Sequence, residues 1–140
     1  MELDDNLKTR LNAEIGRAYY TYERYHVDYT FALVYHEKDI ELDLLGTYVR
    51  VSDKLVRINE NLHFVIYNFT TQDDAYKASK NFLNNLDKHF QSTNSCIAID
   101  APVKTDSTHM VMNKLYQILQ ETKRNSVTRI EYEDILDNAL

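Results

Sequence analysis

The sequence contains very little glycine, proline or cysteine and has no tryptophan. Its 140 residues include two glycines, Gly16 and Gly46, one proline, Pro102, and one cysteine, Cys96. Because the glycines lie far apart, no glycine-rich loop can wrap a phosphate group, and P-loop or Rossmann-type nucleotide binding is excluded. A single cysteine cannot form an internal disulfide, which predicts a reducing, cytoplasmic location.

Long apolar runs and clusters of basic residues are also missing. No run reaches the roughly 18 apolar residues that a membrane-spanning helix needs, so the sequence predicts no membrane span. The N-terminus is acidic and polar and does not resemble a secretory signal. The formal net charge is −6. Since phosphate contacts require lysine and arginine gathered on one face, we expect no nucleic-acid partner.

The chain has enough residues and apolar side chains to form one domain. With 140 residues, of which 44% are hydrophobic, it can bury a core without disulfides or metals. We expect a single domain over residues 1–140. It divides into an N-terminal helix within 1–25, an α/β core over 28–132 and a tail over 133–140.

Four segments show the spacing of an amphipathic helix. Apolar residues recur every three or four positions in each of them, which places these residues on one face. Polar residues that can accept hydrogen bonds from the first helical turn mark the starts of three of them. The predicted helices cover residues 4–25, Asp39 to about Asp53, Thr71 to Phe90, and Thr105 or Asp106 to Thr122.

Short runs rich in β-branched and aromatic residues predict five strands. These are Tyr29–Tyr35, Lys54–Asn59, Leu62–Phe69, Ser95–Asp100 and Val127–Tyr132. Glu60 and Asn61 separate two strands as in a β-hairpin, with Asn61 suited to a left-handed conformation. The resulting order, α-β-α-β-β-α-β-α-β, predicts an α/β (α+β) fold of ferredoxin-like layout, with helices covering one face of one sheet.

The residues around the predicted hairpin resemble those of GGDEF domains, the diguanylate cyclase family. In that family an RxxD pair precedes a strand and then a GG(D/E)EF turn. Here Arg50 and Asp53 form the pair, and five residues separate Asp53 from Asn59, where the first glycine would stand. Phe64–Tyr67 is similar to the strand after the signature, and Arg124-Asn125 is similar to the family's GRN ending. The resemblance implies a nucleotide cyclase-like sheet.

The sequence departs from this family at the positions that carry catalysis. Asn59-Glu60-Asn61-Leu62-His63 stands in place of GG(D/E)EF, whose glycines approach the nucleotide and whose acidic residue helps to hold divalent metals. The path from Tyr35 to Arg50 is too short for the family's FKxxND and GHxxGD elements. The lysine of its AKxxGRN element falls at Gln120, which leaves Arg124 as a remnant of the phosphate contacts.

Phosphoryl transfer depends on positioning and on neutralisation of charge by metals, and these departures impair both. We therefore predict no enzyme activity, no catalytic residues, no metal and no cofactor. The predicted function is that of an inactive GGDEF-like signalling domain, a regulatory or protein-interaction module that binds a protein partner or itself. The surfaces suspected are the open sheet face and a tyrosine-rich helix carrying Tyr19, Tyr20, Tyr22 and Tyr25.

Two alternatives remain open at this point. The resemblance implies a cyclic di-GMP receptor that binds through Arg50 and Asp53, because a guanidinium recognises phosphate and a carboxylate recognises guanine N–H groups. The same two residues could instead form an i,i+3 ion pair on the surface. A more remote alternative is an active diguanylate cyclase or another nucleotide-processing enzyme.

Other polar residues have plainer interpretations. His36, Glu37 and Asp39 follow the first strand, where the family keeps a metal-binding aspartate, and we interpret them as a solvated loop with a helix cap. The remaining histidines, including His63, lack metal-ligand spacing and are expected to be surface or half-buried residues. Cys96 is predicted to be a buried, unreactive thiol.

Overall fold

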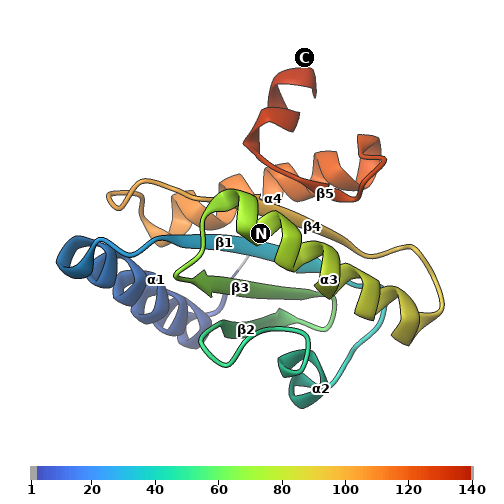
Figure 1. The fold of residues 1–140 in the computed structure, drawn as a ribbon, viewed down its shortest axis with the longest axis horizontal. Coiled ribbons are helices and arrows are strands. Elements are labelled where there is room, and N and C mark those ends of the chain that lie inside the picture. The colour runs from blue at the N-terminus through green and yellow to red at the C-terminus, as the bar shows by residue number, and fades with distance from the viewer. Residues whose placement is uncertain (1–2, 140) are drawn as a thin grey trace.

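A single five-stranded sheet forms the centre of the protein, in a computed structural model that describes residues 3–139. The strand order is β2-β3-β1-β4-β5 (Figure 1). All neighbouring strands are antiparallel except β4 and β5, which are parallel. The strands are β1 (Tyr29–Tyr35), β2 (Lys54–Asn59), β3 (Leu62–Asn68), β4 (Cys96–Asp100) and β5 (Ile130–Glu131).

The structure confirms the predicted order of the four α-helices and five strands. A 3-10 helix follows the last strand. The helices are α1 (Asp5–Tyr25), α2 (Leu42–Gly46), α3 (Gln72–Phe90), α4 (Thr108–Asn125) and η1 (Glu133–Ala139). Thr71 caps α3 as expected, because its hydroxyl accepts a hydrogen bond from the backbone N–H of Asp74. Over residues 3–139, none of the helices is both long and apolar enough for a membrane span.

Helices pack on both faces of the sheet, so the prediction that they cover one face is wrong. Phe31 and Leu33 of β1 point into a core formed with α1 and α4. Ala32 and Val34 point to the opposite side, into a second core formed with α2 and α3. In Figure 1, α3 crosses the front of the sheet. The reason is visible in β1, whose residues are apolar at successive positions and therefore require cover on both faces.

The helix predicted from Asp39 to Asp53 is much shorter than expected. It begins at Leu42 and ends at Gly46, and Asp39 does not cap it. Instead the Asp39 carboxylate accepts a hydrogen bond from the N–H of Ile40 and contacts the guanidinium of Arg57. The residues after Gly46 leave the helical path because the carboxylate of Asp53 binds backbone N–H groups, in competition with helix formation.

Smaller corrections concern the ends of elements. Ser107, rather than Thr105 or Asp106, caps α4, since its hydroxyl accepts from the N–H of Met110. Strand β5 contains only Ile130 and Glu131 instead of Val127–Tyr132. Asn61 is not left-handed; among residues 3–139 the positive φ angles occur at other positions, namely His26, Phe69, Gln91 and Arg129. The tail forms the 3-10 helix η1, and residue 140 lies outside the described residues.

Candidate functional site

The predicted pair Arg50 and Asp53 lies in the turn between α2 and β2, with the Asp53 side chain almost fully buried. That carboxylate accepts hydrogen bonds from the backbone N–H of Arg50 at 3.0 Å and of Asn68 at 3.2 Å. It also accepts from the Arg50 guanidinium, through Nε at 3.2 Å and Nη2 at 2.9 Å. These bonds raise the pKa of Arg50 above its ordinary value. A carboxylate with four such donors is saturated by the chain itself.

Arg50 also fastens this turn to the end of β3. Its Nη2 donates to the carbonyl of Asn68 at 2.7 Å and contacts the hydroxyl of Thr70. The bonds hold the chain on both sides of Phe69, which has a φ of 57°, an uncommon angle for a bulky residue. The Arg50 side chain is nevertheless 53% exposed, against 1% for Asp53. The guanidinium is thus the only part of the pair that a ligand could reach.

The segment that replaces the GGDEF signature is tied to the end of β1. The side-chain oxygen of Asn59 accepts from the N–H of Asn61 at 2.8 Å. The Asn61 side chain donates to the carbonyls of His36 at 3.0 Å and Glu37 at 3.1 Å, and its own carbonyl accepts from the N–H of His36. Leu62 packs into the core beside this turn. The turn is therefore closed against β1.

Behind the turn lies a pair of fully buried histidines, His36 and His63. Nε2 of His36 lies 2.8 Å from Nδ1 of His63, and Nδ1 of His36 lies 2.8 Å from the carbonyl of Lys38. A carbonyl only accepts, so Nδ1 of His36 carries a proton and its Nε2 is the acceptor in the neutral ring. His63 must then donate from Nδ1, which leaves Nε2 of His63 as a buried lone pair without a partner within the described residues.

Burial makes this pair hard to protonate. It lowers the pKa of His36, and it lowers the pKa of His63 to about 4, with the neighbouring His36 as the second cause. The expectation that His36 lies in a solvated loop and that His63 is surface or half-buried is wrong. Only the pairing of β1 with β3 brings the two rings together, and no local sequence signal indicates which strands are neighbours.

Carboxylates near the turn do not assemble into a metal site. Glu37 accepts hydrogen bonds from Ser92 and Asn94, which lower its pKa. Asp39 is paired with Arg57 at 3.3 Å. No group of three histidine, cysteine, aspartate or glutamate side chains suited to a metal occurs in the part of the chain that the structure describes. The divalent metals that the sequence resemblance implies therefore do not fit the donors present.

Arg124 and Cys96 are also singled out by the sequence, and neighbouring residues account for the positions of both side chains. Arg124 is 70% exposed and contacts Glu121 of the same helix at 3.4 Å, and the side chain of Asn125 donates to Glu121 as well. Cys96 is buried as predicted, and burial raises the pKa of its thiol to about 11. Arg124 thus belongs to a surface network on α4, and Cys96 to the core.

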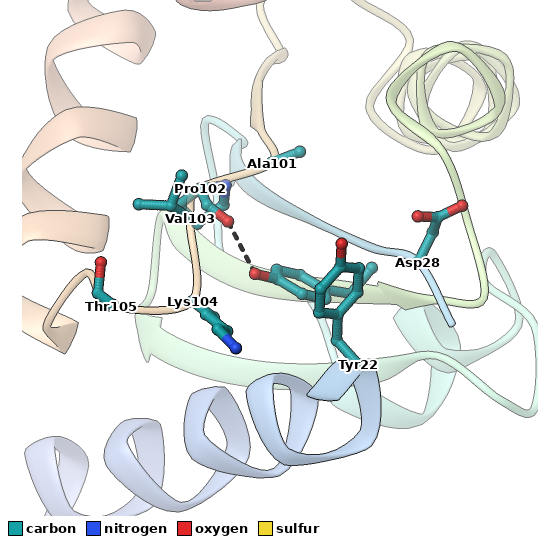
Figure 2. A pocket seen from close by; sticks show the side chains of 8 residues that line it. Tyr22, Asp28, Ala101, Pro102, Val103, Lys104 and Thr105 are labelled. Carbon is teal, nitrogen blue, oxygen red and sulfur yellow. Dashed lines mark hydrogen bonds between the residues drawn. The ribbon is translucent and has the colours of Figure 1, made fainter. Parts of the chain in front are cut away.

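A cavity of about 510 Å³ lies at the other end of β1, and sequence reasoning missed it. It is formed where the end of α1, the start of β1 and the loop between β4 and α4 meet (Figure 2). The only sequence signal that pointed here was the density of tyrosines in α1. The lining residues are Tyr22, Asp28, Tyr29, Ala101, Pro102, Val103, Lys104 and Thr105.

The tyrosines of α1 divide between packing and exposure. Tyr19 and Tyr22 both pack against Tyr29, with ring centroids 5.6 Å and 5.9 Å from it. Tyr20 and Tyr25, by contrast, are 60% and 63% exposed. Burial raises the pKa of Tyr29 to about 12, so its hydroxyl stays protonated and can donate. Tyr19 and Tyr22 thus pack at the cavity end of the sheet, whereas Tyr20 and Tyr25 face outward.

The arrangement of strands and helices places the protein in the class of GGDEF-like α/β folds. The GGDEF domain of DgcB from Caulobacter crescentus, solved in complex with c-di-GMP, has a TM-score of 0.67 and 14% identity, covering 91% of this chain and 88% of that one. The coiled coil and GGDEF domain of the same protein gives a TM-score of 0.65 and 13% identity, covering 93% and 85%.

These two structures establish the fold, which is the one implied by the sequence resemblance. No model of a known protein family matches the sequence. No curated protein matches it either. The likeness is therefore one of three-dimensional arrangement, and the function has to be argued from the side chains.

Proposed function

We propose that the chain is a catalytically inactive GGDEF-like signalling domain that acts as a regulatory or protein-interaction module. The observation that carries this proposal is the closed turn at Asn59–Asn61. The Asn59 side chain accepts from the N–H of Asn61, and the Asn61 side chain donates to the carbonyls of His36 and Glu37 just after β1, where a nucleotide-binding turn would have to stay open. Enzymes that transfer phosphoryl groups rely on positioned donors and metals, and the nearby carboxylates of Glu37 and Asp39 are already paired within the chain.

The connection between β1 and β2 supports the same conclusion. Its only helix is α2, which has five residues, Leu42–Gly46. The rest of the connection is used to bring Arg50 and Asp53 back to the end of β3. No segment remains between the two strands that could enclose a base and a triphosphate.

The direct test is incubation of the purified chain with GTP and magnesium, followed by chromatography for cyclic di-GMP and an assay for pyrophosphate. We expect no product above the buffer blank, while an active diguanylate cyclase in a parallel reaction gives both products. Product formation that a Glu60→Gln variant abolishes would overturn the proposal. Glu60 is chosen because it is the single carboxylate of the turn.

A second candidate function is that of a cyclic di-GMP receptor, favoured by the half-exposed guanidinium of Arg50. Arginine recognises phosphate through a planar fork of donors. Isothermal titration with cyclic di-GMP tests this, using Arg50→Ala and, as a matched control, Arg57→Ala, a similarly exposed arginine. Micromolar binding lost only in Arg50→Ala would make the domain a receptor. If no binding is seen, the role of Arg50 is structural, because its guanidinium holds the turn before β2 to the end of β3.

The partner of the proposed module is a protein, which includes a second copy of the chain. The outward-facing rings of Tyr20 and Tyr25 supply aromatic surface of the kind enriched at interfaces. Sedimentation at increasing concentration, repeated with Tyr20→Ser and Tyr25→Ser, distinguishes self-association from a separate partner. A buried thiol at Cys96 fits the cytoplasm, where we place the module.

A further inference from the structure

Strand β2 forms an edge of the sheet, so one side of its backbone is not paired with another strand. It pairs with β3 alone, and in Figure 1 it lies beyond β3 at the margin of the sheet. The opposite edge, β5, has two residues, against six in β2. An unpaired edge presents N–H and C=O groups to which a further strand can bond. β2 is therefore the longer of the two edges that a partner could extend.

The register of the strands shows which groups of β2 point outward. The N–H of His36 donates to the carbonyl of Asn61, so the odd-numbered residues of β3 bond toward β1 and the even-numbered ones toward β2. Val56 stands opposite an even-numbered residue and therefore bonds to β3. Because bonding alternates along an antiparallel strand, Leu55 and Arg57 direct their backbone groups away from the sheet.

Most of these outward groups have no partner within the part of the chain that the structure describes. The carbonyl of Leu55 accepts from the guanidinium of Arg10 at 3.4 Å, a long hydrogen bond that confirms its outward direction. No group among residues 3–139 bonds the N–H of Leu55, or the N–H and the carbonyl of Arg57. These donors and the acceptor have the spacing with which one antiparallel strand bonds to another.

The side of this edge that lies toward α1 is basic. Lys54 shares this side with Val56, which packs into the core formed with α1. Lys54 and Arg17 line a hollow of about 110 Å³, in which Glu14 is the one carboxylate. Neither of these cations, nor Arg10, forms an ion pair within residues 3–139. Three cations against one carboxylate favour acidic side chains in a partner.

The side of the edge that lies toward α2 carries apolar side chains. Leu55 packs against the core formed with α2 and α3. A second hollow, of about 290 Å³, is lined by Asp39, Ile40, Glu41, Leu42 and Arg57. The charges of Asp39 and Arg57 offset each other, because the two side chains form an ion pair. Leu42 is 41% exposed, so an apolar side chain of a partner would remove it from water.

We propose that the edge of β2 binds an extended segment of a partner protein as an added antiparallel strand, in which acidic residues alternate with apolar ones. The acidic residues lie on the α1 side and the apolar ones on the α2 side, since successive residues of a strand point to opposite faces. The apolar residues stand opposite Leu55 and Arg57 and exchange backbone hydrogen bonds with them. This inference rests on the proposed role as a protein-interaction module, and it names the surface and the chemistry of the partner.

The charges of the edge favour an acidic segment over a second copy of β2. Lysines and bulges protect natural edges against aggregation. Here the strand carries Lys54, Arg57 and a register shift between Arg57 and Asn59. Pairing two copies of β2 would bring the same cations together from both sides, whereas an acidic strand would neutralise them.

The test is a titration of the full chain with a capped peptide of alternating glutamate and valine, followed by isothermal calorimetry and by amide chemical shifts. We expect saturable binding, with the largest shifts at residues 54–59. A peptide with lysine in place of glutamate should bind at least about tenfold more weakly, because it brings like charges to the α1 side. Binding of the glutamate peptide should weaken as salt is added.

Two N-methylated peptides isolate the backbone hydrogen bonds without altering the protein. In the proposed pairing the N–H groups of the valines face β2, whereas those of the glutamates face solvent. Methylation of the valine nitrogens should weaken binding at least about tenfold, and methylation of the glutamate nitrogens by less than about threefold.

Two variants test the same bonds from the side of the protein. Arg57→Pro removes an N–H that points away from β3, so no hydrogen bond within the sheet is lost, and peptide binding should weaken at least about tenfold. Arg57→Ala keeps this N–H and is the matched control, because both variants lose the ion pair with Asp39. Circular dichroism verifies that Arg57→Pro is folded. Lys54→Ala should reduce the preference for the glutamate peptide over the lysine peptide, and Lys104→Ala, in the loop after β4, should leave it unchanged.

The proposal is overturned if the glutamate peptide gives no saturable signal at millimolar concentration, or if the two methylated peptides bind equally. It is also overturned if the peptide does not bind while Arg57→Pro abolishes self-association in sedimentation, since the edge would then hold a second copy. Formation of cyclic di-GMP would refute the inactive function and leave the peptide results unchanged, so the two failures are distinguishable.

Discussion

The two ends of strand β1 use polar residues in opposite ways. At the end near Tyr35, the Asn61 side chain binds the carbonyl of His36, the two histidine rings bind each other, and the Glu37 carboxylate binds Asn94. At the end near Tyr29, the backbone is held by two tyrosine hydroxyls while four polar side chains face a cavity. The comparison shows that polar side chains are engaged within the chain at one end of β1, whereas at the other end tyrosine hydroxyls satisfy the backbone and the polar side chains stay exposed.

The RxxD turn lies at the cavity end of the sheet but resembles the closed end in its chemistry. The Asp53 carboxylate is fully hydrogen-bonded within the chain, and only the Arg50 side chain is accessible. The carbonyl of Asp28, a cavity residue, accepts from the N–H of Thr70, whose hydroxyl contacts Arg50. The turn is therefore connected to the cavity wall indirectly, through Thr70. Four predictions test this division of the molecule into used and unused polar groups.

The largest effect is expected from Asp53→Ala. This change leaves the backbone N–H groups of Arg50 and Asn68 without their acceptor and removes an ion pair with a buried member. The free energy of unfolding should fall by about 3 kcal/mol, measured by urea denaturation. Asp39→Ala, which breaks the exposed pair with Arg57, is the control and should cost less than about 1 kcal/mol. Similar small losses in both variants would mean that Asp53 is not structural.

The histidine pair should make stability depend on pH. The pKa of His63 is lowered from 6.5 to about 4 in the folded protein, so between these values the unfolded chain binds more protons. This contribution to the free energy of unfolding is fully present above pH 6.5 and falls as the pH drops toward 4, by about 3 kcal/mol from His63 alone.

The measurement is a series of urea denaturations from pH 7 to pH 4 on the unaltered chain and on His63→Leu. The variant should lose less stability over this window. Burial raises the pKa of Asp100, which acts in the opposite direction, but this contribution is common to both proteins and cancels in the difference. His89→Gln, at an exposed histidine, should follow the unaltered chain. Equal slopes for all three would contradict a buried neutral pair.

A smaller effect is expected at the turn itself. Asn61→Ala removes the two hydrogen bonds to the carbonyls of His36 and Glu37, and should lower the free energy of unfolding by about 1 kcal/mol. The amide of His36, bonded to the carbonyl of Asn61, should exchange with solvent faster. Asn84→Ala, on the exposed side of α3, should leave that exchange rate unchanged. An unchanged rate in Asn61→Ala would show that the turn is not held by its side chain.

The smallest effect is expected for Arg124→Ala. The side chain is 70% exposed and its contact with Glu121 is a surface ion pair. The free energy of unfolding should change by less than about 0.5 kcal/mol. A loss above about 1 kcal/mol would place Arg124 in a structural network that its exposure does not suggest.

Much of the fold could be predicted because it depends on local patterns. Apolar spacing gave the four helices and their order, and β-branched runs gave the strands. The predictions failed where a polar side chain had a distant partner. Asp39 and Asp53 looked like the ends of one helix, yet Arg57 and the N–H of Asn68 draw them into a loop. A local pattern does not contain such partners.

The candidate sites divide in the same way. The sequence by itself determined that the glycine turn of GGDEF domains is missing and that Arg50 and Asp53 stand in an RxxD motif. Only the tertiary structure decided that Asp53 is buried and saturated, that His36 meets His63, and that a cavity opens beside Tyr29. Spacing along a chain specifies which face a residue takes within its own element. Which elements become neighbours is decided by burying two apolar faces of one sheet at once, and that requires the whole chain.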